Sequence, residues 1–443
     1  MLIMKRVSDS FLKVFQYIYL VLSLIYIVGI PFIVVYMSSV NKYSFLKISR
    51  LTTFYSLVLC LVTFVVFLFE LTLNKKRREM VFERKVILIF LLFFVWCGLS
   101  TFFSSNVHDS FFGVPFRYGG FLQYLSYISF AILGFSLNEK TRKIYFRVLF
   151  FASIIIGIMT LFNGKVSWYK LPTNEICGIF YNINHYGYYL VYTIVVSIFL
   201  FLYDKNIIVK VIDFFGYILL LYILIINNTF GCYIAVLLTI IILFLYFIKN
   251  RENELLMTFL LVPLIFLSVI VRYNDDYVVA SNFKELFNDV SVIFDSDNEK
   301  LPIDDFDNKI NYIGNFRGGL WVRGIKYVFE KPLFGYGLEN VSNRYLKDHI
   351  DIDMPHNLIL QLSMTVGIIG MLLYIAGVLI VLIVGLRNTK KDDILSLLGY
   401  FVLIAHLISA MFGVTIYYVT PYFVIILGAC IRNMKENWCC YEY

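Results

Sequence analysis

An arginine and a histidine form the pair of residues most suited to chemistry in this sequence. Arg317 lies in the stretch that begins with Asn315, and His356 lies directly before a long apolar run. A guanidinium stays charged, is planar and binds phosphate oxygens through two parallel hydrogen bonds. An imidazole has a pKa near neutrality and accepts a proton from an attacking hydroxyl. Together the two side chains suit the transfer of a group from a diphosphate to a hydroxyl.

Spacing alone also allows a structural interpretation of both residues. Arg317 could anchor the chain to lipid headgroups, and His356 could form a hydrogen bond where a helix begins. The apolar residues Leu320, Ile325 and Val328 recur at helical spacing, which predicts an amphipathic helix near the membrane surface. The Lys-Pro pair that follows should end this helix, because proline cannot continue the hydrogen-bond ladder.

Acidic residues of the same segment raise the question of a metal site. His349, Asp351 and Asp353 lie close to His356 in the sequence, and the run 295–307 is rich in aspartate. The run lacks the glycine and glutamate spacing of a calcium-binding EF-hand loop. Such carboxylates are more typical of a solvated loop, so we expect neither a metal ion nor a cofactor.

Composition identifies the solvent in which these residues act. The chain has 443 residues, of which 60% are hydrophobic and only 15% are charged. Soluble globular domains carry about 25% charged residues, so a water-soluble fold could not cover this much apolar surface. The net charge of +8 is interpreted as the lysine and arginine excess of cytoplasmic loops, and no nucleic-acid partner is expected. The first apolar run, 11–37, is too long for a cleavable signal peptide.

The predicted fold class is therefore all-α, a polytopic membrane protein of about twelve transmembrane helices. A helix needs about 20 mostly apolar residues to cross the hydrocarbon core. The twelve candidate spans are 11–37, 51–73, 85–103, 118–137, 145–162, 183–203, 208–227, 229–248, 255–272, 358–385, 394–413 and 416–432.

The distribution of basic residues predicts the orientation of these spans. With the N-terminus in the cytoplasm, the lysines and arginines gather in the inside loops, as the positive-inside rule requires. Both termini are then cytoplasmic, and the large polar loop between spans nine and ten lies outside. The predicted organisation is spans one to nine over 1–272, an extracytoplasmic loop with short amphipathic helices over 273–357, and spans ten to twelve with a cytoplasmic tail over 358–443.

The loop resembles the signature of the O-antigen ligase and O-antigen polymerase superfamily of bacterial membrane glycosyltransferases. In that family an arginine is followed four residues later by tryptophan, then by a Pro-Leu-x-Gly-x-Gly turn, and then by a His-Asn pair before a glycine-containing span. The matching residues here are Arg317, Trp321, Pro332-Leu333, Gly335, Gly337, His356-Asn357 and Gly367-Ile368-Ile369-Gly370. Two earlier stretches also resemble the family, Gly113–Gly120 and Gly178–Asn184.

The resemblance implies an activity and a role for each of these residues. The family transfers glycan from an undecaprenyl diphosphate carrier to a glycan acceptor, with inversion and without metal, at the outer face of the cytoplasmic membrane. By this resemblance Arg317 holds the diphosphate, and His356 serves as or assists the base. Trp321, Asn357 and Asn184 are then expected to bind substrate, although a tryptophan at this depth also suits interfacial anchoring.

The sequence departs from the family pattern at one place. Family members often carry Ser-Arg-Gly near the external end of a middle span, and this arginine also contacts phosphate. Here the corresponding residues are Thr229-Phe230-Gly231. We expect Arg117 or Arg323 to supply the second positive charge.

Three classes of function remain open at this point: an enzyme, a transporter and a scaffold. The favoured one is a polymerase that joins lipid-linked repeat units into capsular or other surface polysaccharide, working with a flippase and a chain-length regulator. A ligase would use the same donor with another acceptor. A flippase for the same lipid-linked glycan also fits twelve spans, but its spans would more often carry charges that line a central cavity. A scaffold has no particular sequence feature in its favour.

Overall fold

The computed structural model describes residues 2–39, 45–115, 117–163, 176–180, 182–248, 254–273, 275–294, 308–390, 392–413 and 416–434. Within these ranges the chain is almost entirely helical. The helices are α1 Leu2–Ser39, α2 Phe45–Leu73, α3 Lys75–Phe82, α4 Val86–Phe102, α5 Val107–Phe112, α6 Phe121–Ser136, α7 Glu139–Asn163, α8 Ile183–Tyr203, α9 Ile207–Asn227, α10 Phe230–Ile248, α11 Glu254–Ile270, α12 Val278–Ile293, α13 Ile313–Glu330, α14 Val341–Lys347, α15 Leu358–Asn388, α16 Ile394–Ala410 and α17 Thr420–Asn433, with a short 3-10 helix η2 at Lys309–Tyr312.

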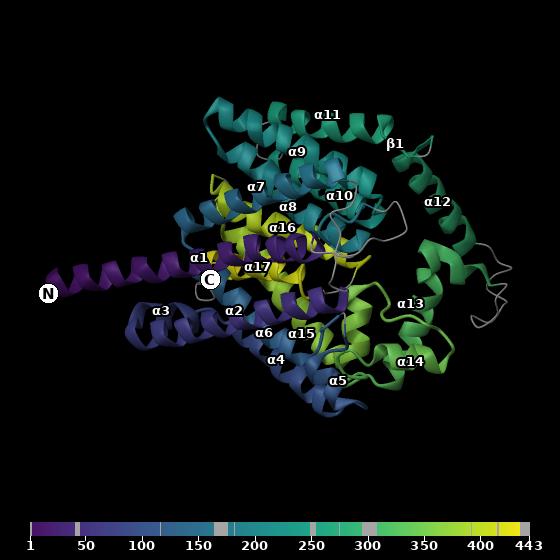
Figure 1. The fold of residues 1–443 in the computed structure, drawn as a ribbon, viewed down its shortest axis with the longest axis horizontal. Coiled ribbons are helices and arrows are strands. Elements are labelled where there is room, and N and C mark those ends of the chain that lie inside the picture. Colours follow the sequence, from purple (N-terminus) through teal and green to yellow (C-terminus); the bar gives the residue numbers. More distant parts are fainter. Residues whose placement is uncertain are drawn as a thin grey trace, which may run out of the picture.

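The helical bundle has two distinct ends (Figure 1). Helix α1 begins at one end, and helices α12, α13 and α14 lie at the other, which we name the loop end. A two-stranded antiparallel sheet, β1 Arg272–Tyr273 with β2 Asp276–Tyr277, connects α11 to α12. The predicted amphipathic helix corresponds to α13, which ends before Lys331 and Pro332 as expected.

Each of the twelve predicted spans coincides with a helix, but the number of spans is not confirmed. Among the described residues seven helices are long and apolar enough to cross a membrane, namely α1, α2, α7, α8, α9, α10 and α15. An eighth is added if α3 and α4, which meet at a bend of 75°, count as one span. Helix α6 has 16 residues and α17 has 14. At a rise of about 1.5 Å per residue, such helices are shorter than a hydrocarbon core of about 30 Å.

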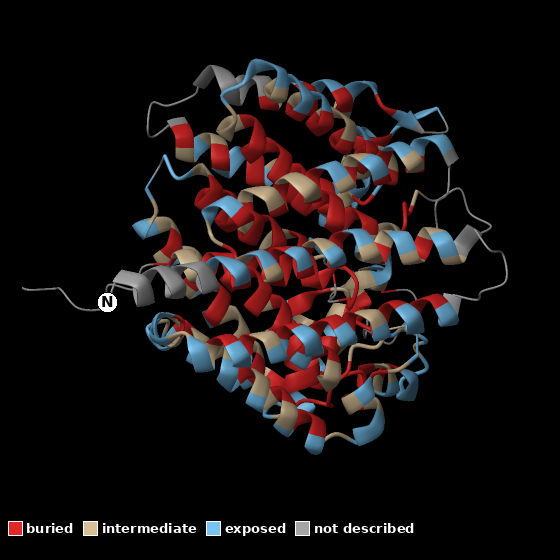
Figure 2. Cartoon of the chain, turned by 60° about the vertical axis from the view of Figure 1, so that its left-hand side comes forward, coloured by how far each residue is buried: buried red, intermediate tan, exposed pale blue. Residues whose placement is uncertain are grey.

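The fraction of buried residues in a helix depends on whether the helix lies in the centre of the bundle or on its outside. Figure 2 shows the buried residues concentrated in the middle of the molecule, with exposed residues on the outer helices. Helix α8 is buried on almost its whole circumference from Tyr186 to Phe201, and it packs against α7, α9, α10 and α16. By contrast α2 exposes large apolar side chains such as Phe54 and Leu61. Apolar exposure of this kind on a long helix suits a lipid environment.

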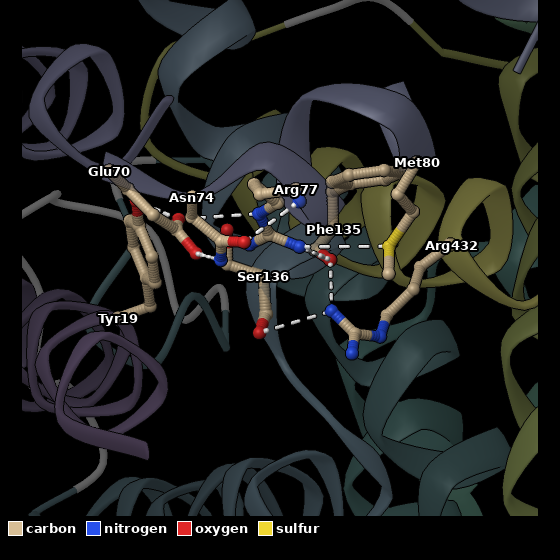
Figure 3. Close-up of polar contacts among 8 residues, drawn as sticks. All are labelled: Tyr19, Glu70, Asn74, Arg77, Met80, Phe135, Ser136 and Arg432. Atoms are coloured by element: carbon tan, nitrogen blue, oxygen red, sulfur yellow. Dashed lines mark hydrogen bonds and ion pairs between the residues drawn. The ribbon is translucent and has the colours of Figure 1, made fainter. Parts of the chain in front are cut away.

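A buried charged cluster (Figure 3) joins five helices at the end of the bundle opposite the loop end. Arg77 and Arg432 both donate to the carbonyl of Phe135, at 3.4 and 3.0 Å. This carbonyl lies in the last turn of α6, where helix carbonyls lack partners within the helix. The carboxylate of Glu70 accepts from Arg77 Nε at 3.2 Å and from the Tyr19 hydroxyl at 2.8 Å. The cluster thus stabilises the packing of α1, α2, α3 and α17 around the end of α6.

Candidate active site

The loop end is built around a break in helix α15. The helix is interrupted at Gly367, whose φ of 75° and ψ of 174° are not helical. The turn formed by residues 332–337, which we name the glycine turn, fills this break. Three backbone hydrogen bonds join the two segments, from Tyr336 to the Met364 carbonyl at 2.8 Å, from Gly337 to the Thr365 carbonyl at 2.9 Å and from Ile368 to the Pro332 carbonyl at 2.8 Å. The break therefore leaves no unpaired carbonyl at Met364 or Thr365.

The close approach of these backbones explains the glycines of the motif. A Cβ atom added to Gly367 would lie 1.9 Å from the carbonyl oxygen of Leu333, and one added to Gly335 would lie 2.5 Å from that of Met364. Both residues also have φ in the left-handed region, at 75° and 66°. Only glycine combines such φ values with this lack of space. The motif glycines are therefore explained by packing and not by contact with substrate.

Helix α4 holds the same two segments from the other side. The Trp96 indole donates to the carbonyl of Val366 at 3.0 Å, and the Ser100 hydroxyl donates to those of Phe334 at 2.7 Å and Thr365 at 2.8 Å. Because α4, α15 and the glycine turn are linked in this way, the segments on both sides of the turn have fixed positions. These segments carry the predicted site residues.

Trp321 links helix α13 to the segment that precedes His356. Its indole Nε1 donates to the carbonyl of Pro355 at 2.8 Å. The hydroxyl of Tyr345 on α14 donates to the carbonyl of Leu320 at 3.0 Å, and this tyrosine is fully buried in a small apolar core between α13, α14 and α15. Trp321 therefore positions the backbone next to the histidine, a role that its place in the motif does not reveal.

His356 has an unusual backbone conformation and an available side chain. Its φ is 52°, in the left-handed region, and the residue is half-buried. Among the residues that the structure describes, its ring forms no hydrogen bond and no ion pair. Burial lowers the pKa of His356 below its ordinary value; Asp353 opposes this effect, and the positive charges of Arg317 and Arg117 add to it. The imidazole is thus held in its neutral form close to two guanidinium groups.

Arg317 is the first of these two groups. It follows Gly314, Asn315 and Phe316, all of which have positive φ and interrupt the helical geometry at the start of α13. The residue is half-buried, and no described residue forms a hydrogen bond or an ion pair with its guanidinium. Its charge acts on His356 and also on Cys232, close to the beginning of α10. Arg317 therefore lies near the place where the family pattern has its second arginine, and its guanidinium is available to a ligand.

Arg117 is the second group, and it already has two partners. Its Nε lies 3.3 Å from a carboxylate oxygen of Glu339, and its Nη1 contacts the carboxylate of Asp353. Burial raises the pKa of Glu339, and Arg117 opposes this. Burial also acts to raise the pKa of Asp353, but the positive charge of Arg117 and its hydrogen bond to the carboxylate, together with the electrostatic interaction with His356, outweigh it and the pKa is lowered. Neither carboxylate was among the predicted site residues; Asp353 was considered only as an unfavoured metal ligand.

Several residues other than glycine that have a positive, left-handed φ belong to this site or lie close to it in the chain. The described chain has eight non-glycine residues with such a φ, and five are Tyr118, Asn315, Phe316, Glu339 and His356. Each of the five belongs to the site, forms an ion pair with one of its residues, or lies within two residues of one in the chain. Such conformations are costly for residues with a side chain, and they persist where the surrounding structure imposes them, often at functional sites. A cluster of this kind indicates a preorganised site.

The remaining predicted residues have other contacts. Arg323 donates to the Asn311 side chain at 2.8 Å, so its guanidinium faces η2. Asn357 caps α15 by accepting from the Leu360 amide at 3.0 Å, and its amide group donates to the Met411 carbonyl at 3.2 Å.

Asn184 is half-buried in the first turn of α8. The next residue, His185, bonds to the hydroxyl of Tyr418 and interacts electrostatically with Arg117, Asp353 and His356. The structure therefore places Arg117, Arg317 and the beginning of α8 within electrostatic reach of His356, whereas Arg323 and Asn357 are bonded to neighbouring parts of the fold.

An apolar cavity of about 320 Å³ lies between α2, α4, α6, α15 and α17. Its lining includes Leu358 and Leu362 at the start of α15, together with Phe90, Tyr374 and Phe423. Leu358 is only two residues from His356 in the chain. The cavity thus extends from the neighbourhood of the site into the apolar part of the bundle.

Comparison with known proteins gives one match. Residues 215–375 match the family model described as O-antigen ligase. No curated protein matches the chain. The matched range runs from α9 into α15 and contains Arg317, Trp321, the glycine turn and His356. This match over part of the chain supports its assignment to the O-antigen ligase and O-antigen polymerase superfamily.

Proposed function

We propose that the protein is a surface-polysaccharide polymerase. It transfers glycan from undecaprenyl diphosphate-linked repeat units to a growing chain at the outer face of the cytoplasmic membrane, after a flippase has exported the units. The observation that carries the proposal is that two guanidinium groups, Arg317 and Arg117, act electrostatically on the half-buried imidazole of His356, to which no described residue bonds.

The two arginines suit a diphosphate leaving group. A guanidinium is always charged and matches the geometry of phosphate oxygens, and fixed positive charges stabilise the negative charge that develops as the bond breaks. Arg317 has no described partner, so its donors are available. We assign the second positive charge to Arg117, because it acts on His356 whereas Arg323 is bonded to Asn311.

His356 suits the role of general base. Its lowered pKa keeps the imidazole neutral near pH 7, so it can accept a proton. In the proposed step, the acceptor hydroxyl transfers its proton to His356 while its oxygen forms a bond to the anomeric carbon. The bond between this carbon and the diphosphate oxygen breaks, and the diphosphate leaves with both electrons of that bond. A single displacement of this kind inverts the anomeric centre and needs no metal ion.

The apolar cavity supports a lipid-linked donor. Apolar cavities with few polar groups bind apolar ligands, and this one begins beside Leu358, close to the proposed base. A polyprenyl tail in the bundle would leave its diphosphate near Arg117 and Arg317.

A ligase is the second candidate, because the matching family model is described as O-antigen ligase. The two functions share the donor chemistry and differ in the acceptor. Polymer chain length distinguishes them, since only a polymerase is needed for the growth of the chain.

The decisive experiment replaces the chromosomal gene with Arg317→Ala or His356→Asn. Asparagine is chosen because it tolerates positive φ better than alanine, so the backbone at φ 52° is retained. Cells with either variant should lose long polysaccharide chains and accumulate single lipid-linked units outside the membrane. Gel electrophoresis of extracted polysaccharide measures the chain length. Labelling of intact cells with a membrane-impermeant glycan reagent measures the lipid-linked units outside the membrane.

Matched controls come from the same segment. Lys326→Ala removes an exposed positive charge from α13, and His349→Asn replaces an exposed histidine that also has positive φ. Both should leave chain length unchanged. Accumulation of units on the inner face would indicate a flippase, and normal polymer in both site variants at normal protein levels would rule out the proposed site.

A further inference from the structure

The two carboxylates that contact Arg117 differ greatly in exposure. The side chain of Glu339 is 3% exposed, and that of Asp353 is 52% exposed. They also come from different segments: Glu339 follows the glycine turn, whereas Asp353 precedes His356 by three residues. Breaking the ion pair with the buried Glu339 therefore costs more free energy than breaking the one with Asp353.

Glu339 is a permanent partner on physical grounds. Removing Arg117 from a buried carboxylate would leave an uncompensated charge in a region of low polarity, which is strongly unfavourable. The fold also leaves Glu339 little freedom, because its φ is 62° and a Cβ atom at Gly119 would lie 2.1 Å from its Oε1. The buried carboxylate of Glu339 thus fixes the position of the Arg117 guanidinium through the contact with Arg117 Nε.

Asp353 is a replaceable partner. A carboxylate that is half exposed returns to water at a lower cost than a buried one. A diphosphate carries more negative charge than one carboxylate and offers several acceptor oxygens, so it competes well for the Nη donors of Arg117. Displacement of Asp353 would leave the pair between Arg117 and Glu339 intact.

We propose that Asp353 is a positioning residue that releases Arg117 to the diphosphate of the substrate and then pairs electrostatically with His356. The proposal rests on the proposed function. Before the substrate binds, Asp353 neutralises part of the charge of Arg117. Once phosphate oxygens take over this task, the carboxylate is free to stabilise the imidazolium that forms when His356 accepts the proton. Binding of the donor would thereby strengthen the base at the moment when it is needed.

The charged groups that face His356 make this exchange effective. They are Asp353, Arg317 and Arg117, and His185 of α8 lies within the same electrostatic environment. Asp353 is the one negative group that acts on His356 in the described part of the chain, and the two arginines oppose it. When the diphosphate neutralises both arginines, the effect of Asp353 on the imidazole is no longer offset.

The test is Asp353→Asn, which keeps the size of the side chain and removes its charge. The substrate is the lipid-linked unit extracted from cells that carry His356→Asn, and the rate of polymer formation is measured against pH. Loss of the carboxylate should lower the pKa of His356 in the complex with substrate, so the acid limb of kcat moves to lower pH. A weaker base should also reduce kcat about three- to tenfold, with KM for the lipid-linked unit raised less than twofold. Asp353→Glu should restore most of the rate.

Binding of farnesyl diphosphate to the purified protein in detergent provides a second measurement, with farnesol as the ligand that lacks the diphosphate. Asp353→Asn should bind farnesyl diphosphate at least as tightly as the unmodified protein, because Arg117 no longer needs to be released. Glu339→Gln should bind it more weakly, because Arg117 loses its fixed partner. If Asp353→Asn weakens binding as much as Arg117→Ala does, or leaves the acid limb in place, the exchange is refuted. If the unmodified protein neither binds the probe nor forms polymer, the proposed function itself fails.

Discussion

In the proposed mechanism His356 depends on its surroundings and not on bonds with its own ring. No described residue bonds to the imidazole, yet the Trp321 indole donates to the carbonyl of the preceding Pro355, and His356 itself has a left-handed φ of 52°. Two arginines and burial favour the neutral ring. A base held in this way needs no reorganisation before it receives a proton.

The pH dependence of kcat/KM follows from these surroundings. This ratio reports groups of the free enzyme, in which burial, Arg317 and Arg117 lower the pKa of His356 against the opposing effect of Asp353. In the proposed mechanism the neutral imidazole is the active form, so activity is lost as the pH falls through this lowered pKa. We expect kcat/KM to stay constant from pH 7.5 to the ordinary histidine value of about 6.5 and to decline only below it. Polymer formation by membranes in a series of buffers measures this. An acid limb above pH 6.5 would show that the positive charges do not control His356.

The break in α15 explains how a transmembrane helix carries part of the site. Gly367 ends the first part of the helix, and the glycine turn supplies the amide groups that satisfy the carbonyls of Met364 and Thr365. Unsatisfied carbonyls in a membrane would cost several kcal/mol each. The turn therefore cannot move independently of the helix, and Glu339 and α14, which follow the turn, are positioned along with it.

Gly367→Ala tests this coupling. The φ of 75° with a ψ of 174° is close to a region that is nearly exclusive to glycine, and a Cβ atom would lie 1.9 Å from the Leu333 oxygen. Backbone strain of this kind costs roughly 1–3 kcal/mol, and displacement of the turn adds to it. We expect a lower unfolding temperature in detergent and loss of polymer.

Gly98→Ala is the control for this substitution, because its Cβ atom would meet only the ring edge of Phe121, at 3.2 Å, in the helical geometry of α4. It should change the unfolding temperature much less than Gly367→Ala. Equal effects of the two substitutions would mean that the break in α15 has no special role.

The sequence predicts the helices better than the contacts between them. Each apolar segment is a helix, because hydrophobic length and composition are local properties of the chain. The number of spans depends on length relative to the bilayer and on bends, such as the one of 75° between α3 and α4, which composition does not reveal. Arg317 and His356 were predicted from a motif. The pairing of Arg117 with Glu339, 222 residues away, depends on tertiary structure and on a positive φ that no local pattern signals.

At the scale of the whole molecule, positive charge is concentrated at both ends of the bundle, but in different settings. Arg77, Arg84, Arg142 and Arg432 interact electrostatically at the end where α17 finishes. Arg77 and Arg432 are bonded to the end of α6, and Glu70 compensates part of the charge. At the loop end Arg317 has no described partner. The positive-inside rule predicts that the first cluster faces the cytoplasm, and the proposed function requires the second cluster to bind an anionic ligand.

This difference predicts an orientation that labelling can test. In a chain whose two tail cysteines, Cys439 and Cys440, are changed to serine, Lys326→Cys on α13 and Lys75→Cys on α3 place exposed thiols at opposite ends of the bundle. The described native cysteines are all buried and should react slowly. A membrane-impermeant maleimide should label position 326 in intact cells, and position 75 only after the membrane is made permeable. The reverse pattern would place Arg117, Arg317 and His356 in the cytoplasm, where exported lipid-linked units cannot reach them. Labelling at both positions in intact cells would indicate that the reagent enters the cells. The background chain without either new cysteine should remain unlabelled, and labelling of this chain would indicate that the buried native thiols react.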